Sequence, residues 1–316
     1  MAFDFAAVTA PFRMQPGLRR LASGATQLTP IGPGDRHFVE KLGVLAAHPH
    51  EALVSGAGFE PAAALHSLCE HAAKEHPAHW KWEQRNGTLI ASAPALGCSV
   101  RDKEVSCDTT SDLGAVLRAL PADWRLPALL SLAFAEDFAV LDASTGCVPW
   151  LAVCLPSHWA PEDKVGRHFA EVHAPVADNE LLIKASDHLA RLVTGPDRWE
   201  RFVWTFTREP RLRMHPRHLD TPAWPSEASV DEIAAITYFR SERQTFIPVA
   251  DQAQAVFAIH VESRSLIQAV STTAVARQLH DALASMSPAV LAYRGLTHSR
   301  DRLLDWLARR AAEPAP

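Results

Sequence analysis

The sequence predicts an α+β protein built around one antiparallel sheet. Residues 137–143 and 149–156 have the composition of a β-hairpin, and helical patterns follow at 160–173 and 179–195. Three strand-like segments come next without intervening helices. Strands that alternate with helices would indicate a parallel sheet, whereas a hairpin, a helical stretch and a three-strand meander favour a single antiparallel sheet. With 316 residues, the chain is long enough for more than one ordinary domain.

The N-terminal third predicts a mixed, mainly helical subdomain. Apolar residues at helical spacing predict helices at 37–53, 60–76 and 111–120. Residues 88–94 and 104–109 lie between the last two helices and are expected to pair as a hairpin. We therefore assign residues 1–126 to a separate N-terminal part.

Residues 127–272 predict the sheet itself. The glycine-containing segment 144–147 supplies the hairpin turn, and Gly195 ends the second helix at the position expected of a C-cap. The meander strands, rich in aromatic and β-branched residues, are 201–208, 234–249 and 254–266. Helical patterns at 273–286 and 298–312 form a C-terminal tail, residues 273–316.

A hairpin, a helical middle and a meander in this order are typical of the PAS architecture, a five-stranded antiparallel sheet. We expect the N-terminal part to cover one face of the sheet. The helical middle then encloses the other face and leaves a cavity for a flat cofactor.

Composition excludes several classes of protein. The formal net charge of −5 argues against a nucleic-acid-binding face, and no apolar run approaches the roughly 18 residues of a membrane span. The N-terminus lacks a signal-peptide pattern, so a cytoplasmic protein with no membrane partner is expected. Its five cysteines are predicted to be reduced structural thiols. Nucleotide-binding glycine loops, zinc-protease motifs and nucleophile elbows are absent from the sequence.

Four motifs carry a family resemblance. They are 156-PSHWAPEDKVGRHFAEVHAPV-176, 202-FVWTF-206, 239-FRSERQTFIPV-249 and 255-AVFAIHVES-263, preceded by 11-PFRMQPGLRRL-21. Together they resemble the haem-binding alpha subunit of the haem-dependent oxidative N-demethylase family. The chain departs from the family pattern at 245-TFIPV-249, where an arginine is missing, and at Ala177, where a second proline is usual.

The resemblance implies a PAS-like domain that holds haem b. It also implies oxidation of a small methylated amine by dioxygen, with release of formaldehyde and with electrons from flavin and iron–sulfur partner proteins. The corresponding function is a haem-dependent monooxygenase. A haem-PAS sensor without catalysis is the alternative, although no output domain is visible in these 316 residues.

His173 is the candidate axial ligand of the haem iron. It ends a helical segment whose apolar residues should point inward, and Pro175 fixes the direction of the chain behind it. A neutral imidazole is a suitable iron ligand. Alternatively, a cationic His173 caps the helix C-terminus. His188, in the second helical segment, is the rival ligand.

Strand alternation places Arg240, Glu242 and Gln244 on one face and Ser241 and Arg243 on the other. We expect Arg240 or Gln244 to hydrogen-bond iron-bound dioxygen and Glu242 to attract the substrate ammonium. The alternative for Glu242 is a cross-strand ion pair. Further candidate contacts to the cofactor, each with structural packing as the alternative, are Lys164, Arg167, Trp204, Tyr238, Arg243 and His260.

Overall fold

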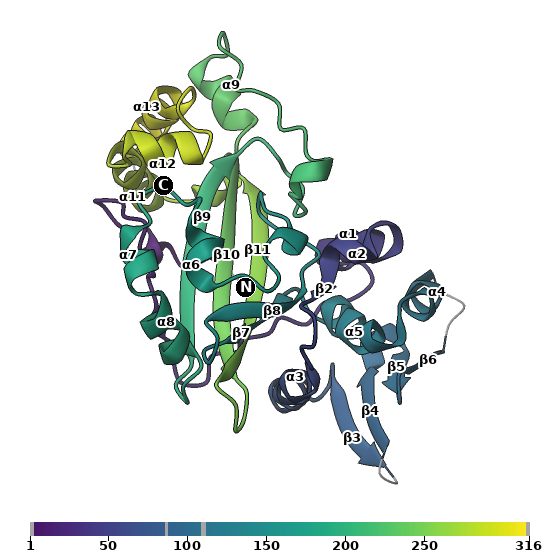
Figure 1. The fold of residues 1–316 in the computed structure, drawn as a ribbon. Helices are drawn as coiled ribbons and strands as arrows, with labels where there is room; N and C mark the ends of the chain where they lie inside the picture. Colours follow the sequence, from purple (N-terminus) through teal and green to yellow (C-terminus); the bar gives the residue numbers. More distant parts are fainter. Residues whose placement is uncertain (1–2, 86–87, 109–111, 314–316) are drawn as a thin grey trace.

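The computed structural model describes residues 3–85, 88–108 and 112–313, which contain two antiparallel sheets (Figure 1). The larger has seven strands in the order β1-β9-β10-β11-β7-β8-β2. Its strands are β1 (Arg19–Arg20), β9 (Trp199–Thr207), β10 (Tyr238–Pro248), β11 (Gln254–Ser265), β7 (Asp137–Asp142), β8 (Cys147–Ala152) and β2 (Leu53–Ser55).

The five strands expected from the sequence form the centre of this sheet, so the antiparallel α+β class is confirmed. The expected count of five is wrong, because β1 and β2 from the N-terminal part pair with the outer strands β9 and β8. Strands of two and three residues are too short to show period-2 alternation, which explains why the sequence did not predict them.

The smaller sheet lies beyond α3 and α5, away from the larger one (Figure 1). Its strands are β3 (Lys81–Arg85), β4 (Thr88–Ala93), β5 (Cys98–Arg101) and β6 (Glu104–Cys107). The predicted pairing of 88–94 with 104–109 is wrong, because β5 lies between β4 and β6; residue 109 lies outside the described residues.

Two of the five cysteines form a disulfide, which corrects the prediction of five free thiols. Cys98 and Cys107 are directly opposite each other on β5 and β6 and are bonded. The other three remain thiols, of which Cys69 and Cys154 are buried. The short hairpin brings the pair together, and its register was not visible in the sequence.

The helices come from three parts of the chain. The N-terminal helices are α1 (Arg36–Ala47), α2 (Pro49–Ala52), α3 (Ala62–Glu75), α4 (Asp112–Ala119) and α5 (Arg125–Ala133). The middle helices are α6 (Phe169–His173), α7 (Glu180–Lys184), α8 (Ser186–Val193) and α9 (Val230–Ala235). The C-terminal helices are α10 (Leu266–Ala269), α11 (Thr273–Ala284), α12 (Pro288–Tyr293) and α13 (Arg300–Ala312). No helix in the described ranges has the length and apolar character needed to cross a bilayer.

The middle helices are shorter than predicted. The expected helix at 160–173 is a 3-10 turn (Pro161–Asp163) followed by α6, with Gly166 between them at φ +73°. This left-handed residue interrupts the helical path. The start of the expected strand 234–249 belongs instead to α9, which begins with a capping box formed by Ser229 and Glu232.

The two faces of the larger sheet are covered by different helices. On one face, which we call the α6 face, Phe246 and Ala255 pack with Ala190 and Val193 of α8, and Phe169 of α6 lies against them. On the other, which we call the α3 face, strand residues such as Val256 and Ala258 share a buried cluster with α3 and α5. The helical middle and the N-terminal part therefore cover opposite faces, as the sequence predicted.

Gly146 in the β7–β8 turn positions the start of α6. It adopts φ +68°, and a Cβ added here would collide with the imidazole of His168. That imidazole caps α6 by accepting the Ala170 backbone N–H at its Nδ1. Glycine is therefore required both by the backbone conformation and by the space available.

Replacing Gly146 with alanine is expected to lower the free energy of unfolding by about 1–3 kcal/mol, because it adds left-handed strain and displaces the cap. Urea denaturation measures the change. The control is Gly34→Ala, whose added Cβ meets no atom within 4 Å. Equal losses in the two variants would contradict this explanation.

Candidate functional site

His173 is the last residue of α6, and one of its ring nitrogens is available. Its Nδ1–H donates to the Phe169 carbonyl at 2.8 Å, which leaves the lone pair on Nε2. Nε2 makes no hydrogen bond to any described residue. Burial lowers the pKa of His173 to about 4, so the ring is neutral at pH 7. The cationic-cap alternative is therefore disfavoured, while a neutral donor suited to iron is present.

Glu242 lies on the α6 face of β10 and is held by two neighbours. Ser157 Oγ donates to one carboxylate oxygen, and Gln244 Nε2 donates to the other at 2.6 Å. Gln244 therefore supports Glu242, and both share a face with Arg240 as alternation predicted.

Arg240 is buried, and its guanidinium is engaged by the protein itself. Its Nε donates to Ser157 Oγ at 2.9 Å, and its terminal nitrogens donate to the carbonyls of Pro156, Arg211 and Leu212. Four donated bonds leave little capacity for dioxygen. Arg240 instead fixes Ser157, which in turn orients Glu242.

Arg201 was missed by the sequence reasoning and lies on the same face. It is opposite Gln244 across the β9–β10 ladder, and its Nε is buried without a hydrogen-bond partner among the described residues. Burial lowers the pKa of Arg201, and the attraction of Glu242 offsets this only in part. Alternation in 199–207 could have identified the face of this arginine, but its neighbours depend on a register that the sequence does not show.

Three predicted cofactor contacts lie on the other face of the sheet. Arg243 and His260 are directly opposite each other on β10 and β11. Because Arg243 follows Glu242 by one residue, its side chain points to the opposite face of the sheet. Arg243 Nε binds Glu200 at 2.9 Å, and His260 Nδ1 lies 2.9 Å from a Glu136 oxygen. Trp204 is opposite Ser241 and packs in the aromatic cluster with Phe12, Phe206 and Phe239. The sheet therefore separates these residues from His173.

The remaining predicted residues differ in exposure. Lys164 Nζ donates to the Val172 carbonyl at 3.0 Å, near the end of α6, and burial lowers its pKa. Tyr238 is on the α6 face by register, but it lies at the beginning of β10. The side chains of Arg167 and of the rival ligand His188 are exposed.

A family model described as "Haem-dependent oxidative N-demethylase, alpha subunit-like" matches residues 36–304. The chain belongs to this family. The match runs from the first residue of α1 into α13, so it includes both faces of the sheet and the whole α6 segment. It confirms the resemblance inferred from the motifs, and the family description indicates an oxidative, haem-dependent enzyme.

Several side chains on the α6 face of this N-demethylase family member are chemically compatible with haem. His173 offers a neutral nitrogen for iron. Two buried donors on the same face, Arg201 Nε and Trp199 Nε1, have no hydrogen-bond partner among the described residues. Buried donors are rarely left unpaired, so this face suits an anionic group such as a propionate.

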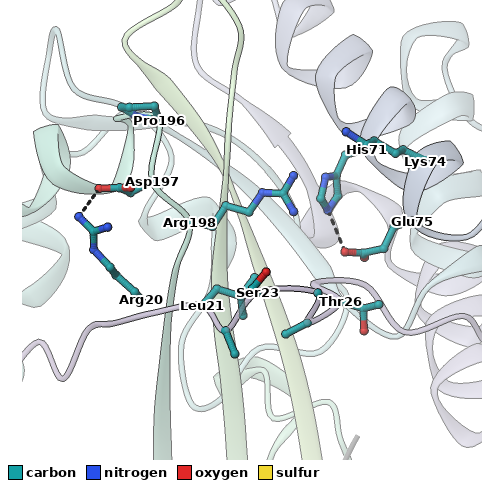
Figure 2. Close-up of a pocket in the computed structure, with 13 residues that line it drawn as sticks. Arg20, Leu21, Ser23, Thr26, His71, Lys74, Glu75, Pro196, Asp197 and Arg198 are labelled. Atoms are coloured by element: carbon teal, nitrogen blue, oxygen red, sulfur yellow. Dashed lines mark hydrogen bonds and ion pairs between the residues drawn. The ribbon is translucent and has the colours of Figure 1, made fainter.

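A separate cavity of about 560 Å³ lies between the 20–26 segment, α3 and the 196–198 loop (Figure 2). None of the residues predicted for the N-demethylase site lines it. Figure 2 shows Arg198 extending toward His71, whose Nε2 lies 3.4 Å from Glu75, while Arg20 binds Asp197 at 2.7 Å. The residues that line this cavity therefore do not include His173 or Glu242 of the α6 face.

Proposed function

We propose that the chain is the haem b-binding subunit of an oxidative N-demethylase that acts on a small secondary amine. The observation that carries the proposal is a neutral His173 with a free Nε2, located on the sheet face that also holds Glu242 and the unpaired Arg201. The central strands, a hairpin joined through β7 to a meander, support a PAS-like domain for this site.

In this proposal each residue has a distinct task. His173 holds the haem iron, and Arg201 with Lys164 neutralises the propionates. Glu242 holds the substrate ammonium through its carboxylate, which Ser157 and Gln244 orient. Removal of water from this face strengthens the attraction.

The haem supplies activation of dioxygen for oxidation of the N-methyl carbon. One amine, one dioxygen, two electrons and two protons yield the demethylated amine, formaldehyde and water. The electrons come from flavin and iron–sulfur partner proteins; the family's description as an alpha subunit supports such partners. The description as an N-demethylase also favours an enzyme over a haem sensor.

The direct test is formaldehyde release from small methylated amines by the haem-loaded protein with an artificial reductant and dioxygen. We expect formaldehyde and the demethylated amine in equal amounts, dependent on all three components. A haem-loaded protein that reduces and binds dioxygen, yet releases no formaldehyde from any amine in the series, would refute the proposed reaction.

Glu242→Gln is expected to reduce kcat/KM for a cationic amine on the order of tenfold, because a neutral amide attracts an ammonium less than a carboxylate does. Steady-state formaldehyde assays measure the effect, and an unchanged Soret band shows that haem is retained. The matched control is Glu227→Gln, at an exposed position. Equal activity of the Glu242 variant and wild type would remove Glu242 from the binding site.

A further inference from the structure

We propose that His37, His260 and Glu262 form a site for a divalent cation of the zinc class, on the sheet face opposite His173. One nitrogen of each imidazole and one carboxylate oxygen of Glu262 lie within 4.8 Å of one another. His37 comes from α1, while the other two come from β11. Two histidines and one glutamate with an open fourth position are a common ligand set for Zn²⁺.

Hydrogen bonds fix the orientation of both imidazole rings. His260 Nδ1 lies 2.9 Å from the buried Glu136 carboxylate, and its Nε2 lies 3.2 Å from Glu262. His37 Nε2 donates to the Val261 carbonyl at 2.7 Å, which places the lone pair on Nδ1. Metal-bound histidines almost always donate their other N–H to a carboxylate or a carbonyl, which fixes the tautomer and the ring orientation.

The charges around the site favour a cation. The buried Glu136 carboxylate accepts the Thr29 backbone N–H at 2.9 Å and lies 2.9 Å from His260 Nδ1, while Glu262 lies 3.2 Å from His260 Nε2. The nearby Lys41 is 3.2 Å from Asp137, so these two charges offset each other. With neutral imidazoles, two carboxylates therefore remain to be neutralised.

The side chain of Arg264, the residue two positions beyond Glu262, is exposed. A bound divalent ion would offset both carboxylates.

A second histidine cluster lacks these features and provides a control. His48, Glu51 and His218 also have ligand atoms within 4.8 Å of one another. Glu51, however, already accepts hydrogen bonds from the guanidinium groups of Arg213 and Arg217 and from His218. A carboxylate surrounded by two guanidinium groups is a poor ligand for a cation.

The experiment is calorimetric titration of Zn²⁺ into the tag-free, chelator-treated haem protein. We expect one saturable site per chain, an affinity at least about tenfold lower in His37→Gln and Glu262→Gln, and an unchanged affinity in His48→Gln. Zinc-edge absorption spectroscopy should show two imidazole nitrogens at about 2.0–2.1 Å. It does not detect the haem iron, so it distinguishes the two metals.

Three results would overturn the site: no saturable binding, equal affinity in wild type and both site variants, or loss of binding in His48→Gln alone. Glu262 is 26% exposed, so Glu262→Gln provides a test if the buried His37 variant does not fold. Circular dichroism and the Soret band check each variant. These measurements test the metal site separately from the proposed N-demethylation, since neither of them measures formaldehyde.

Discussion

Replacing His173 with alanine is expected to remove the Soret band of the purified protein. His173 Nε2 is the free, neutral donor at the end of α6, and its pKa near 4 keeps it unprotonated at pH 7. Loss of a residue that merely orients a metal ligand costs about 10–100-fold in metal affinity. Loss of the ligand itself should therefore weaken haem binding by at least about 100-fold, measured by titrating haem into the haem-free variant.

His188→Ala is the matched control, because its imidazole is exposed on α8, the neighbouring helix. We expect this variant to keep the wild-type spectrum. Exogenous imidazole should partly restore the band in His173→Ala, since it supplies the missing donor to a folded site. A band lost only in the His188 variant would move the ligand to α8, and a wild type without a band would refute haem binding altogether.

Local sequence patterns predicted two kinds of feature: which residues of one strand share a face, and the order of the strands and helices. The shared face of Arg240, Glu242 and Gln244 followed from period 2 along one strand, and the structure confirms it. The hairpin, the helical middle and the meander likewise followed from composition and order. Each of these features depends on neighbours within one segment, where spacing along the chain determines which side chains lie together.

Features that depend on register between segments were not predictable in the same way. Arg201 meets Gln244 only because β9 pairs with β10 in one particular register. The sequence gives no phase between β10 and β11, so it could not show that His260 pairs with Arg243 and shares its face. The interruption of the helix at Gly166 was also not predicted, because glycine adopts left-handed and helical conformations about equally well and the sequence does not distinguish them.

Arg201→Met is expected to change stability and haem affinity in opposite directions. Arg201 is half-buried, with a buried Nε, and burial outweighs the attraction of Glu242 in lowering its pKa, so its charge destabilises the haem-free fold. Replacing a buried charge with an apolar side chain of similar length should raise the free energy of unfolding of the haem-free protein by about 1–3 kcal/mol. Urea denaturation after haem removal measures this gain.

Haem affinity should fall in the same variant. A hydrogen bond between charged groups contributes about 1.5–3 kcal/mol, so losing the Arg201 contact to a propionate corresponds to roughly a 10–100-fold weaker affinity. Competitive transfer of haem to apomyoglobin measures the ratio. Arg167→Met, which removes an exposed cation from the segment just before α6, should change neither quantity appreciably.

The opposite signs distinguish a ligand-binding arginine from a structural one. If Arg201 served mainly to compensate Glu242, its removal would leave that carboxylate uncompensated, and stability and haem affinity would fall together. If Arg201 is instead kept unpaired in order to bind an anion, its charge lowers the stability of the haem-free protein, and the bound propionate offsets this loss. Such an exchange of stability for binding is common where a site must hold a charge away from water. A rise in haem-free stability with a fall in affinity would therefore support a role for Arg201 in holding the cofactor.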